Sequence, residues 1–282
     1  MEIVTQSSEL HKINKGSIAF VPTMGALHAG HGALIEQARK ISDQVVVSIF
    51  VNPLQFSDAA DLLKYPHSPE ADAQVAAQAG ASTLWLAQAD EIYPAEFEMI
   101  SPSQVGSTFE GAAREGHFAG VLTVVKRLFD LVAPKWALFG EKDFQQLFLI
   151  NEMVDEKKLG VILQSVPTQR NSSGLALSSR NERLDEAGQL AALCLYRALS
   201  RAGQEGNLLE MQEVLRQTLL QEPAFTLDYA AIIDERTFHV AQQQTPAKRA
   251  LVAGWINGVR LIDNMAMTNI GMTNIGMEGE LR

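Results

Sequence analysis

Four short segments of the sequence contain side chains whose types and spacing could support chemistry. The first, PTMGALHAGH, spans residues 22–31 and holds His28 and His31 beside Gly25 and Gly30. Glycine lets the backbone approach a ligand closely, and free amides at a helix start attract anions, so both imidazoles could donate to one phosphate. A zinc pair is disfavoured because there is no HExxH motif and no evident third ligand. A structural histidine is the alternative for either residue alone, but the pair in a glycine-flanked turn favours phosphate.

The second segment, SIFVNPLQF, places Asn52 and Gln55 just after an apolar run. Neutral amides at the end of a strand could orient a polar substrate without adding charge. Formation of an Asn-Pro turn is the alternative, and it accounts for Asn52 but leaves Gln55 unexplained.

The third segment, FGEKDFQQL, combines a turn glycine, Gly140, with three polar residues at a predicted helix start. Lys142 offers an ammonium group to phosphate or carboxylate, Asp143 could accept hydrogen bonds from sugar hydroxyls, and Gln146 follows about one helical turn later. Acidic residues at a helix start simply complement the helix dipole, whereas a lysine does not. Because Lys142 breaks this local rule, it is the stronger functional candidate.

The fourth segment, GLALSSRN over residues 174–181, is a small-residue loop that contains Ser178, Ser179 and Arg180. Two hydroxyl donors and a permanently charged guanidinium group could close over a polyphosphate. A plain linker is the alternative. The loop lies at the junction of two predicted domains, which favours a closing element.

Predicted strands and helices alternate along the first part of the chain, and these elements must position the four segments. Residues 17–22 and 44–51 are continuous apolar runs rich in β-branched residues, and the stretch between them has helical spacing. Further strands are expected at residues 82–87, 135–140 and 161–166, and further helices at 68–80, 121–133 and 143–158. This alternation predicts an α/β fold with a mostly parallel sheet, covered on both faces, and ligands at the carboxyl ends of its strands.

After about residue 180 the pattern changes to a smaller α+β domain. Two helical stretches are followed by short strands, at residues 187–203, 207–222, 227–234, 250–256 and 258–263. The predicted domains are therefore residues 1–174 and 175–282. The tail at about 266–282 repeats TNIGM without usable periodicity, and we expect it to be mobile.

Composition limits the classes of function. The 282 residues are 46% hydrophobic and carry a formal charge of −10, which opposes nonspecific binding to nucleic acid or to anionic membranes. We find neither a secretory signal nor a long apolar run, so we expect a soluble, cytoplasmic protein. The single cysteine, Cys194, excludes an intrachain disulfide and a cysteine-based metal cluster.

Six motifs, in order over nearly the whole chain, resemble the pantoate-β-alanine ligase (pantothenate synthetase) family: PTMGALHAGH, VSIFVNPLQF, HFAGVLTVVKRLF, LFGEKDFQQL, GLALSSRN and GVRLIDN. The first is similar to the HIGH motif of nucleotidyltransferases and class I aminoacyl-tRNA synthetases, and LSSRN takes the place of their KMSKS loop. The resemblance implies a Rossmann-like N-terminal domain, a small C-terminal lid domain and a homodimer. It also implies synthesis of pantothenate from pantoate and β-alanine, with ATP cleaved to AMP and pyrophosphate.

Site residues follow from the same resemblance. His31, His28 and Lys142 would be catalytic, Gln55 and Gln146 would hold pantoate, and Gln55 would also lie near β-alanine. ATP would be bound by Met24, Gly25, Ala26, Leu27, His28, Ala29, Gly30, His31, Gly140, Glu141, Lys142, Asp143, Gln169, Leu177, Ser178, Ser179 and Arg180. Arg114 and His117 would lie in the loop that leads into a helix near the dimer interface.

The sequence departs from the family pattern at three places. Ser173 in QRNSSGLA replaces the usual aspartate, which predicts a change in loop conformation or pyrophosphate affinity, and Gln169 is polar where a small apolar residue is common. Mg²⁺ is expected to be carried by the ATP phosphates, with Asp72 the candidate protein ligand. Ala71 in place of a neighbouring acid weakens that assignment.

The predicted mechanism has two steps in one cleft. The pantoate carboxylate attacks the α-phosphorus of ATP while His28, His31, Lys142 and Mg²⁺ stabilise the charge, and the loop at 174–181 then shields the adenylate until the β-alanine amine attacks. A nucleotidyltransferase that stops at transfer of AMP or CMP to a phosphorylated acceptor is the alternative enzyme, but it leaves Gln55 and Gln146 unexplained. A regulatory nucleotide-binding module without turnover is the alternative outside enzymes, and the altered NSS stretch is its only support.

Overall fold

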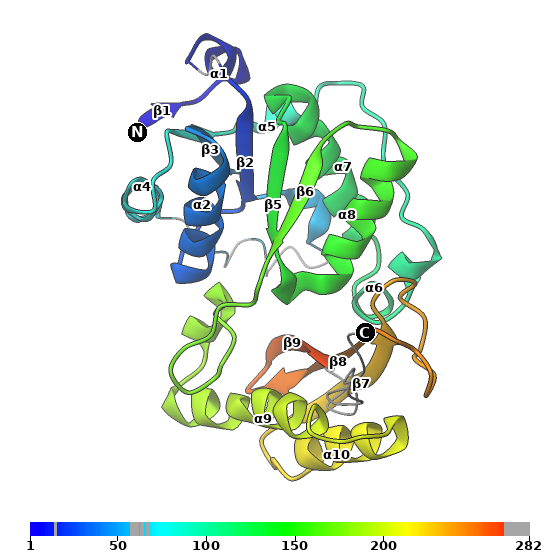
Figure 1. The fold of residues 1–282 in the computed structure, drawn as a ribbon. Helices are drawn as coiled ribbons and strands as arrows, with labels where there is room; N and C mark the ends of the chain where they lie inside the picture. The colour runs from blue at the N-terminus through cyan, green and yellow to red at the C-terminus, as the bar shows by residue number, and fades with distance from the viewer. Residues whose placement is uncertain (14–15, 57–61, 63–64, 66–67, 268–282) are drawn as a thin grey trace, which may run out of the picture. The chain divides into compact units, whose positions relative to one another are not determined.

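The computed structural model of the chain describes residues 1–13, 16–56, 62, 65 and 68–267 (Figure 1). It divides into two compact units, one of residues 1–171 with 176–181 and the other of residues 172–175 with those from 182 onward. A bridge between Arg170 and Ala176 and a hydrogen bond from the Leu177 amide to the Gln169 carbonyl hold 176–181 to the first unit. The chain therefore passes between the two units around residue 174, where the boundary was expected, and residues 176–181 return to the first unit. From residue 268 the expected mobile tail lies outside the described residues.

The first unit is built on a six-stranded sheet, in the order β1-β4-β3-β2-β5-β6, in which all neighbouring strands run parallel. The strands are β1 (Glu2–Val4), β2 (Ile18–Thr23), β3 (Gln44–Ile49), β4 (Thr83–Leu86), β5 (Trp136–Gly140) and β6 (Ile162–Val166). The parallel sheet expected from the continuous apolar runs is therefore confirmed, with β1 added at one edge.

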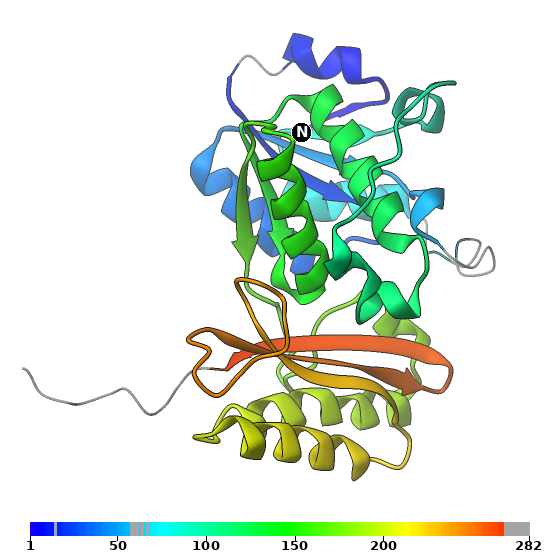
Figure 2. The ribbon, with the colours of Figure 1, turned by 90° about the vertical axis from the view of Figure 1, so that its right-hand side faces the viewer.

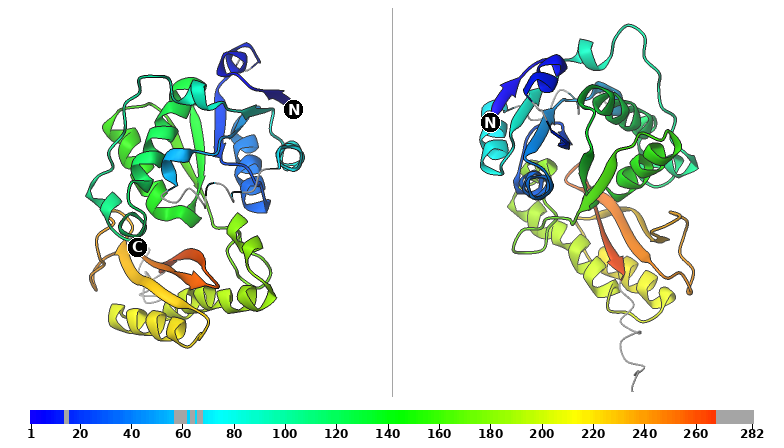
Figure 3. Two further views of the ribbon diagram at one scale, coloured as in Figure 1. Left: turned by 180° about the vertical axis from the view of Figure 1, so that it is seen from behind. Right: turned by 45° about the horizontal axis from the view of Figure 1, so that its top comes forward.

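Helices cover both faces of this sheet. Ile18 and Phe20 of β2 belong to the apolar core shared with α7 and α8, whereas Ala19 and Val21 point the opposite way, into the core shared with α2 and α4. Figure 3 shows these two helical layers on opposite sides of the sheet. The helices are α1 (Ser7–Ile13), α2 (Ala29–Ile41), α4 (Pro69–Gln78), α5 (Ala89–Ile92), α6 (Glu110–Ala113), α7 (His117–Val132) and α8 (Phe144–Glu156), with 3-10 turns η1 (Pro53–Gln55), η2 (Gln104–Ser107) and η3 (Glu141–Asp143).

Register brings the ends of the central strands to one edge. Strands β2 and β3 pair from Ile18↔Gln44 to Thr23↔Ile49, so both end at the same level. Strand β5 runs parallel to β2 on its other side and ends at Gly140. The segments that follow these three strands therefore begin beside one another.

The second unit is an antiparallel sheet, β7-β8-β9, with two helices packed on it (Figure 2). Its elements are α9 (Glu186–Ala202), α10 (Leu208–Leu220), β7 (Thr226–Asp234), β8 (Lys248–Ile256) and β9 (Val259–Met267), and the 3-10 turn η4 (Ser179–Arg183) leads into it. The α+β architecture expected for this part is confirmed. Across the part of the chain that the structure describes, no helix is both long and apolar enough to cross a membrane.

Candidate active site

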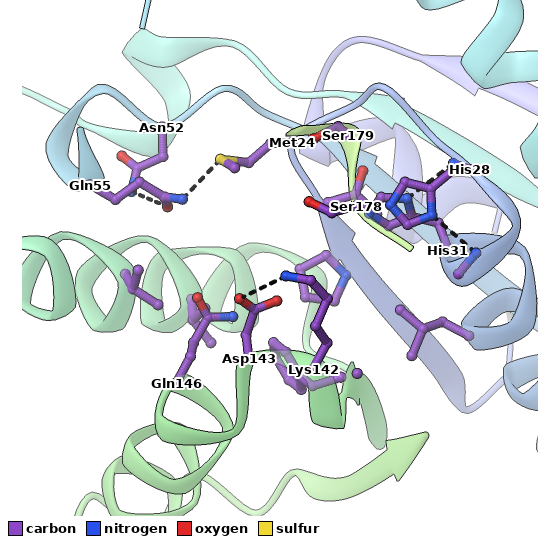
Figure 4. A pocket seen from close by; sticks show the side chains of 18 of the residues that line it. Met24, His28, His31, Asn52, Gln55, Lys142, Asp143, Gln146, Ser178 and Ser179 are labelled. Carbon is purple, nitrogen blue, oxygen red and sulfur yellow. Dashed lines mark hydrogen bonds and ion pairs between the residues drawn. The ribbon is translucent and has the colours of Figure 1, made fainter. Parts of the chain in front are cut away.

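A cavity of about 240 Å³ opens at the carboxyl ends of β2, β3 and β5 in the first unit. Side chains from all four chemically promising segments line it, and Figure 4 shows them around one space. The strand-to-helix turn after β2, the turn η1 after β3 and the turn η3 after β5 supply most of the polar groups. The site thus forms where a parallel sheet exposes its strand ends.

His28 and His31 are locked into one tautomer by the backbone at the start of α2. The Gly30 amide donates to Nδ1 of His28 at 3.0 Å, and the His28 amide donates to Nδ1 of His31 at 3.2 Å. A nitrogen that accepts from an amide carries no proton, so each neutral ring has its proton on Nε2. The ring centroids are 4.2 Å apart, which places both Nε2–H donors in one neighbourhood.

Both imidazoles are uncharged at neutral pH. Burial, followed by the proximity of His28, lowers the pKa of His31 to about 3. Burial and then the Lys142 ammonium also lower the pKa of His28. The pair therefore offers two hydrogen-bond donors and no positive charge.

The positive charge beside them comes from Lys142 in η3. Its Nζ lies 3.7 Å from Oδ1 of Asp143, and its side chain is 18% exposed. Desolvation disfavours the charged form of Asp143. The positive charges of Lys142 and then Arg180 outweigh this effect and hold the pKa of the Asp143 carboxyl below its ordinary value. Gln146 lines the same cavity from the first turn of α8, as the spacing after Lys142 predicts.

Gln55 is held on its backbone and on its side chain. Its carbonyl accepts from Nδ1 of His117 at 2.8 Å and from Arg114 at 3.3 Å, and its Nε2 donates to the Met24 sulfur at 2.9 Å. Burial, followed by the charge of Arg114, lowers the pKa of His117 to about 3, so this ring is neutral. The amide side chain of Asn52 donates to Oε1 of Gln55 at 3.0 Å.

The serine-containing loop also reaches the cavity. Ser178, Ser179 and Arg180 line it, and Ser178 Oγ accepts from the Arg180 amide at 3.3 Å. Asn181 donates to the Ala176 carbonyl at 2.9 Å, which closes the loop on itself.

Nearly the whole sequence matches one known family. A family model described as pantoate-beta-alanine ligase matches residues 2–266. The chain belongs to the pantoate-β-alanine ligase family. It is 45% identical over 261 residues to the pantothenate synthetase of Acidothermus cellulolyticus, covering 89% of this chain and 86% of that one.

Solved structures of this ligase family have the same fold as this chain. The pantothenate synthetase of Thermus thermophilus superposes with a TM-score of 0.89 at 41% identity, covering 94% of this chain and 99% of that one. The pantoate-β-alanine ligase of Francisella tularensis, crystallised with β,γ-ATP and β-alanine, gives a TM-score of 0.77 at 35% identity, covering 94% and 97%. The Rossmann-like character of the first unit and the assignment of this chain as an ATP-dependent ligase rest on these matches.

Most of the residues expected from the ligase motifs line the cavity. Those that do are Met24, His28, Gly30, His31, Gln55, Gly140, Lys142, Asp143, Gln146, Gln169, Leu177, Ser178, Ser179 and Arg180. The expected residues that do not line it are Gly25, Ala26, Leu27, Ala29 and Glu141, which belong to the same turns, and Asp72, which comes from α4.

One lining residue that sequence reasoning missed is Tyr65. Its hydroxyl lies 3.4 Å from the Gly25 carbonyl, and burial raises the pKa of its phenol. No periodic pattern or motif surrounds this residue in the sequence, so no signal marked it.

Proposed function

We propose that this cavity joins pantoate to β-alanine in two steps, with ATP cleaved to AMP and pyrophosphate. One observation carries the proposal: two neutral imidazoles, the Lys142 ammonium group and the amides of Gln55 and Gln146 line the same cavity. Donors and a cation suit a phosphate chain, whereas neutral amides suit a hydroxy acid. A phosphorylated acceptor would require more cations beside the two glutamines.

In the first step a pantoate carboxylate oxygen attacks the α-phosphorus of ATP. The new P–O bond forms as the bond to pyrophosphate breaks, which gives pantoyl adenylate. Nε2–H of His28 and of His31 and the ammonium of Lys142 stabilise the added charge on the transferring and leaving phosphates. Gln55 and Gln146 orient the pantoate, so that its carboxylate faces the phosphorus.

In the second step the amine of β-alanine attacks the acyl carbon. The C–N bond forms, the bond to AMP breaks, and one proton leaves the nitrogen. Gln55 adjoins the entering amine in this proposal. Ser178, Ser179 and Arg180 shield the adenylate, which is a reactive mixed anhydride, from water.

Magnesium is the metal that this proposal includes. Within the described ranges there is no group of three or more His, Cys, Asp or Glu side chains that could hold a metal ion. This donor set fits an ion held mainly by substrate phosphates, as is usual for Mg²⁺. When bound, the ion would neutralise phosphate charge beside Lys142.

The oligomeric state and the location in the cell belong to the same proposal. The family resemblance implies a homodimer, which light scattering of the purified protein would detect. The second is a cytoplasmic location, which fractionation of the source cells would test.

The proposal is tested by supplying MgATP, pantoate and β-alanine, omitting each in turn, and following the products by mass spectrometry. Pantothenate, AMP and pyrophosphate should form together, and ¹⁸O placed in the pantoate carboxylate should appear in AMP. AMP transferred to an acceptor without amide formation would instead support a nucleotidyltransferase. ATP binding without pyrophosphate release would support the regulatory module.

A further inference from the structure

Asp72, outside the cavity lining, accepts hydrogen bonds from the turn that precedes the histidines. Asp72 is only 2% exposed and lies in the first turn of α4. Oδ1 accepts from the Leu27 amide at 2.6 Å, and Oδ2 accepts from the Ala26 amide at 3.1 Å. One carboxylate thus bonds to two consecutive amides immediately before His28.

The turn that these bonds hold has an unfavourable backbone conformation. Gly25 has a φ of 88° and Ala26 a φ of 51°, and an alanine rarely adopts a positive φ. A Cβ on Gly25 would lie 3.0 Å from Oδ2 of Asp72, which shows how closely the carboxylate approaches the turn. Such a conformation persists when surrounding contacts determine it, and the Asp72 carboxylate supplies two of them.

We infer that Asp72 is a positioning residue for the first chemical step: it fixes the turn at Gly25 to Leu27, and thereby directs the Nε2–H groups of His28 and His31 at the phosphates. The inference rests on the proposed function. Leu27 directly precedes His28, whose side chain caps α2 and whose amide orients the His31 ring. A shift of the turn would therefore move both imidazoles.

This role differs from that of a magnesium ligand. Each oxygen of Asp72 already accepts from one amide, and the residue does not line the cavity among those that the structure describes. A ligand role predicts that loss of the carboxylate raises the magnesium requirement. A positioning role predicts slower adenylation at an unchanged magnesium requirement.

Asp72→Asn is the direct test, because asparagine keeps the shape but has one accepting oxygen for two amides. Glu70→Gln is the matched control: it removes a carboxylate from the same first turn of α4, where Glu70 is exposed. Pantoate-dependent exchange of labelled pyrophosphate into ATP should fall up to about 100-fold in Asp72→Asn, because a misplacement near 1 Å can cost that much in rate. The reaction of supplied pantoyl adenylate with β-alanine and the magnesium concentration at half-maximal exchange should stay unchanged.

Rescue provides a second measurement. Ala26→Gly, added to Asp72→Asn, should recover part of the exchange rate, because glycine adopts a positive φ without a clash of Cβ. The double variant also serves if Asp72→Asn alone is too unstable to purify. The inference would be overturned if excess Mg²⁺, and not Ala26→Gly, restored the exchange rate of Asp72→Asn. It would also be overturned if Asp72→Asn exchanged pyrophosphate as fast as Glu70→Gln.

Different measurements test the ligase activity and the role of Asp72. A wild-type protein without pantoate-dependent exchange would contradict the function alone. Imidazole nitrogen spectra need no turnover: the wild type should show His28 and His31 as Nε2–H tautomers, and Asp72→Asn should lose that uniform pattern. An unchanged spectrum in Asp72→Asn would overturn the positioning role.

Discussion

The hydroxyl of Tyr93 donates a hydrogen bond of 2.6 Å to Oδ1 of Asn52, at the outer end of a chain of contacts that leads to Gln55. Asn52 in turn donates from Nδ2 to Oε1 of Gln55 at 3.0 Å and to the Gly120 carbonyl at 3.1 Å, while the Leu54 amide donates to Oδ1 at 3.2 Å. The amide of Asn52 thus has one orientation. It turns the donating Nε2 end of Gln55 away from Asn52 and toward the Met24 sulfur, which accepts from it at 2.9 Å at the cavity lining.

Tyr93→Phe should weaken pantoate binding more than it slows turnover. The substitution removes one hydrogen bond to a buried amide, which costs about 1–2 kcal/mol and corresponds to roughly a 5- to 30-fold higher KM for pantoate. Steady-state kinetics with pantoate varied would measure the change, and kcat should move little. Phe97→Leu is the control, because Phe97 packs on the Tyr93 ring, with centroids 4.8 Å apart, but leaves the hydroxyl in place. Equal changes in both variants would assign the effect to ring packing.

The parallel sheet could be predicted because its strands are buried on both faces and are therefore continuous apolar runs. Strand β1 and helix α1 could not, since they are short and depend on distant partners: Ser7 in α1 donates from its amide to Glu91 at 2.8 Å. Strand β9 is longer than its apolar pattern because pairing with β8 extends to Lys248↔Met267. Local pattern thus predicts buried elements but not the extension that pairing adds.

In the site, too, some residues could be predicted from the sequence and others could not. His28 and Lys142 were predictable because each belongs to a motif and also lies where a predicted strand ends and a helix begins. The supporting contacts were not: Tyr93 lies 41 residues from Asn52, and the carboxylate of Asp72 meets the Leu27 amide across 45 residues. Such pairs depend on the packed fold, and no periodicity in a single sequence marks them.

Gly120→Ala should destabilise the protein and disturb Gln55. A Cβ at this position in α7 would lie 2.2 Å from the Leu54 carbonyl oxygen and 2.8 Å from the Gln55 nitrogen, both of which are backbone atoms. The turn η1 must therefore move, and this cost outweighs the gain of about 1 kcal/mol that alanine brings to a helix interior. Thermal unfolding should show a lower Tm, and kinetics a higher KM for pantoate.

Gly32→Ala is the matched control for that change. Gly32 lies inside α2, and a Cβ there would have its nearest contact, Ala79, at 4.0 Å. The helix gain then has no opposing clash, so Tm should rise or stay unchanged. A Gly120→Ala variant as stable as Gly32→Ala would contradict the close approach of α7 and η1.

Lys142→Met should slow adenylation strongly. Methionine keeps much of the apolar stem but removes the ammonium, and the loss of one preorganised contact to developing charge costs about 10²–10³ in rate. Pyrophosphate exchange would measure this step, and Lys157→Met is the control, because Lys157 lies 3.9 Å from Glu98 and outside the cavity lining. Exchange near the wild-type rate in Lys142→Met would remove Lys142 from the mechanism.

Acid should destabilise the folded protein through its neutral histidines. The folded pKa values of His31 and His117 are lowered to about 3, mainly by burial, whereas an unfolded histidine has a pKa near 6.5. The stability that these rings contribute is fully present above about pH 6.5 and is lost as the pH falls toward 3. In this range the histidines of the unfolded chain bind protons, whereas the buried rings of the folded chain do not. Between pH 7.5 and 5.5 the free energy of unfolding should drop by about 1.4 kcal/mol for each ring with a folded pKa of about 3. Urea unfolding at both values would measure the drop. His117→Gln should remove the contribution of one ring, whereas His239→Gln, which alters an exposed side chain, should leave the drop unchanged.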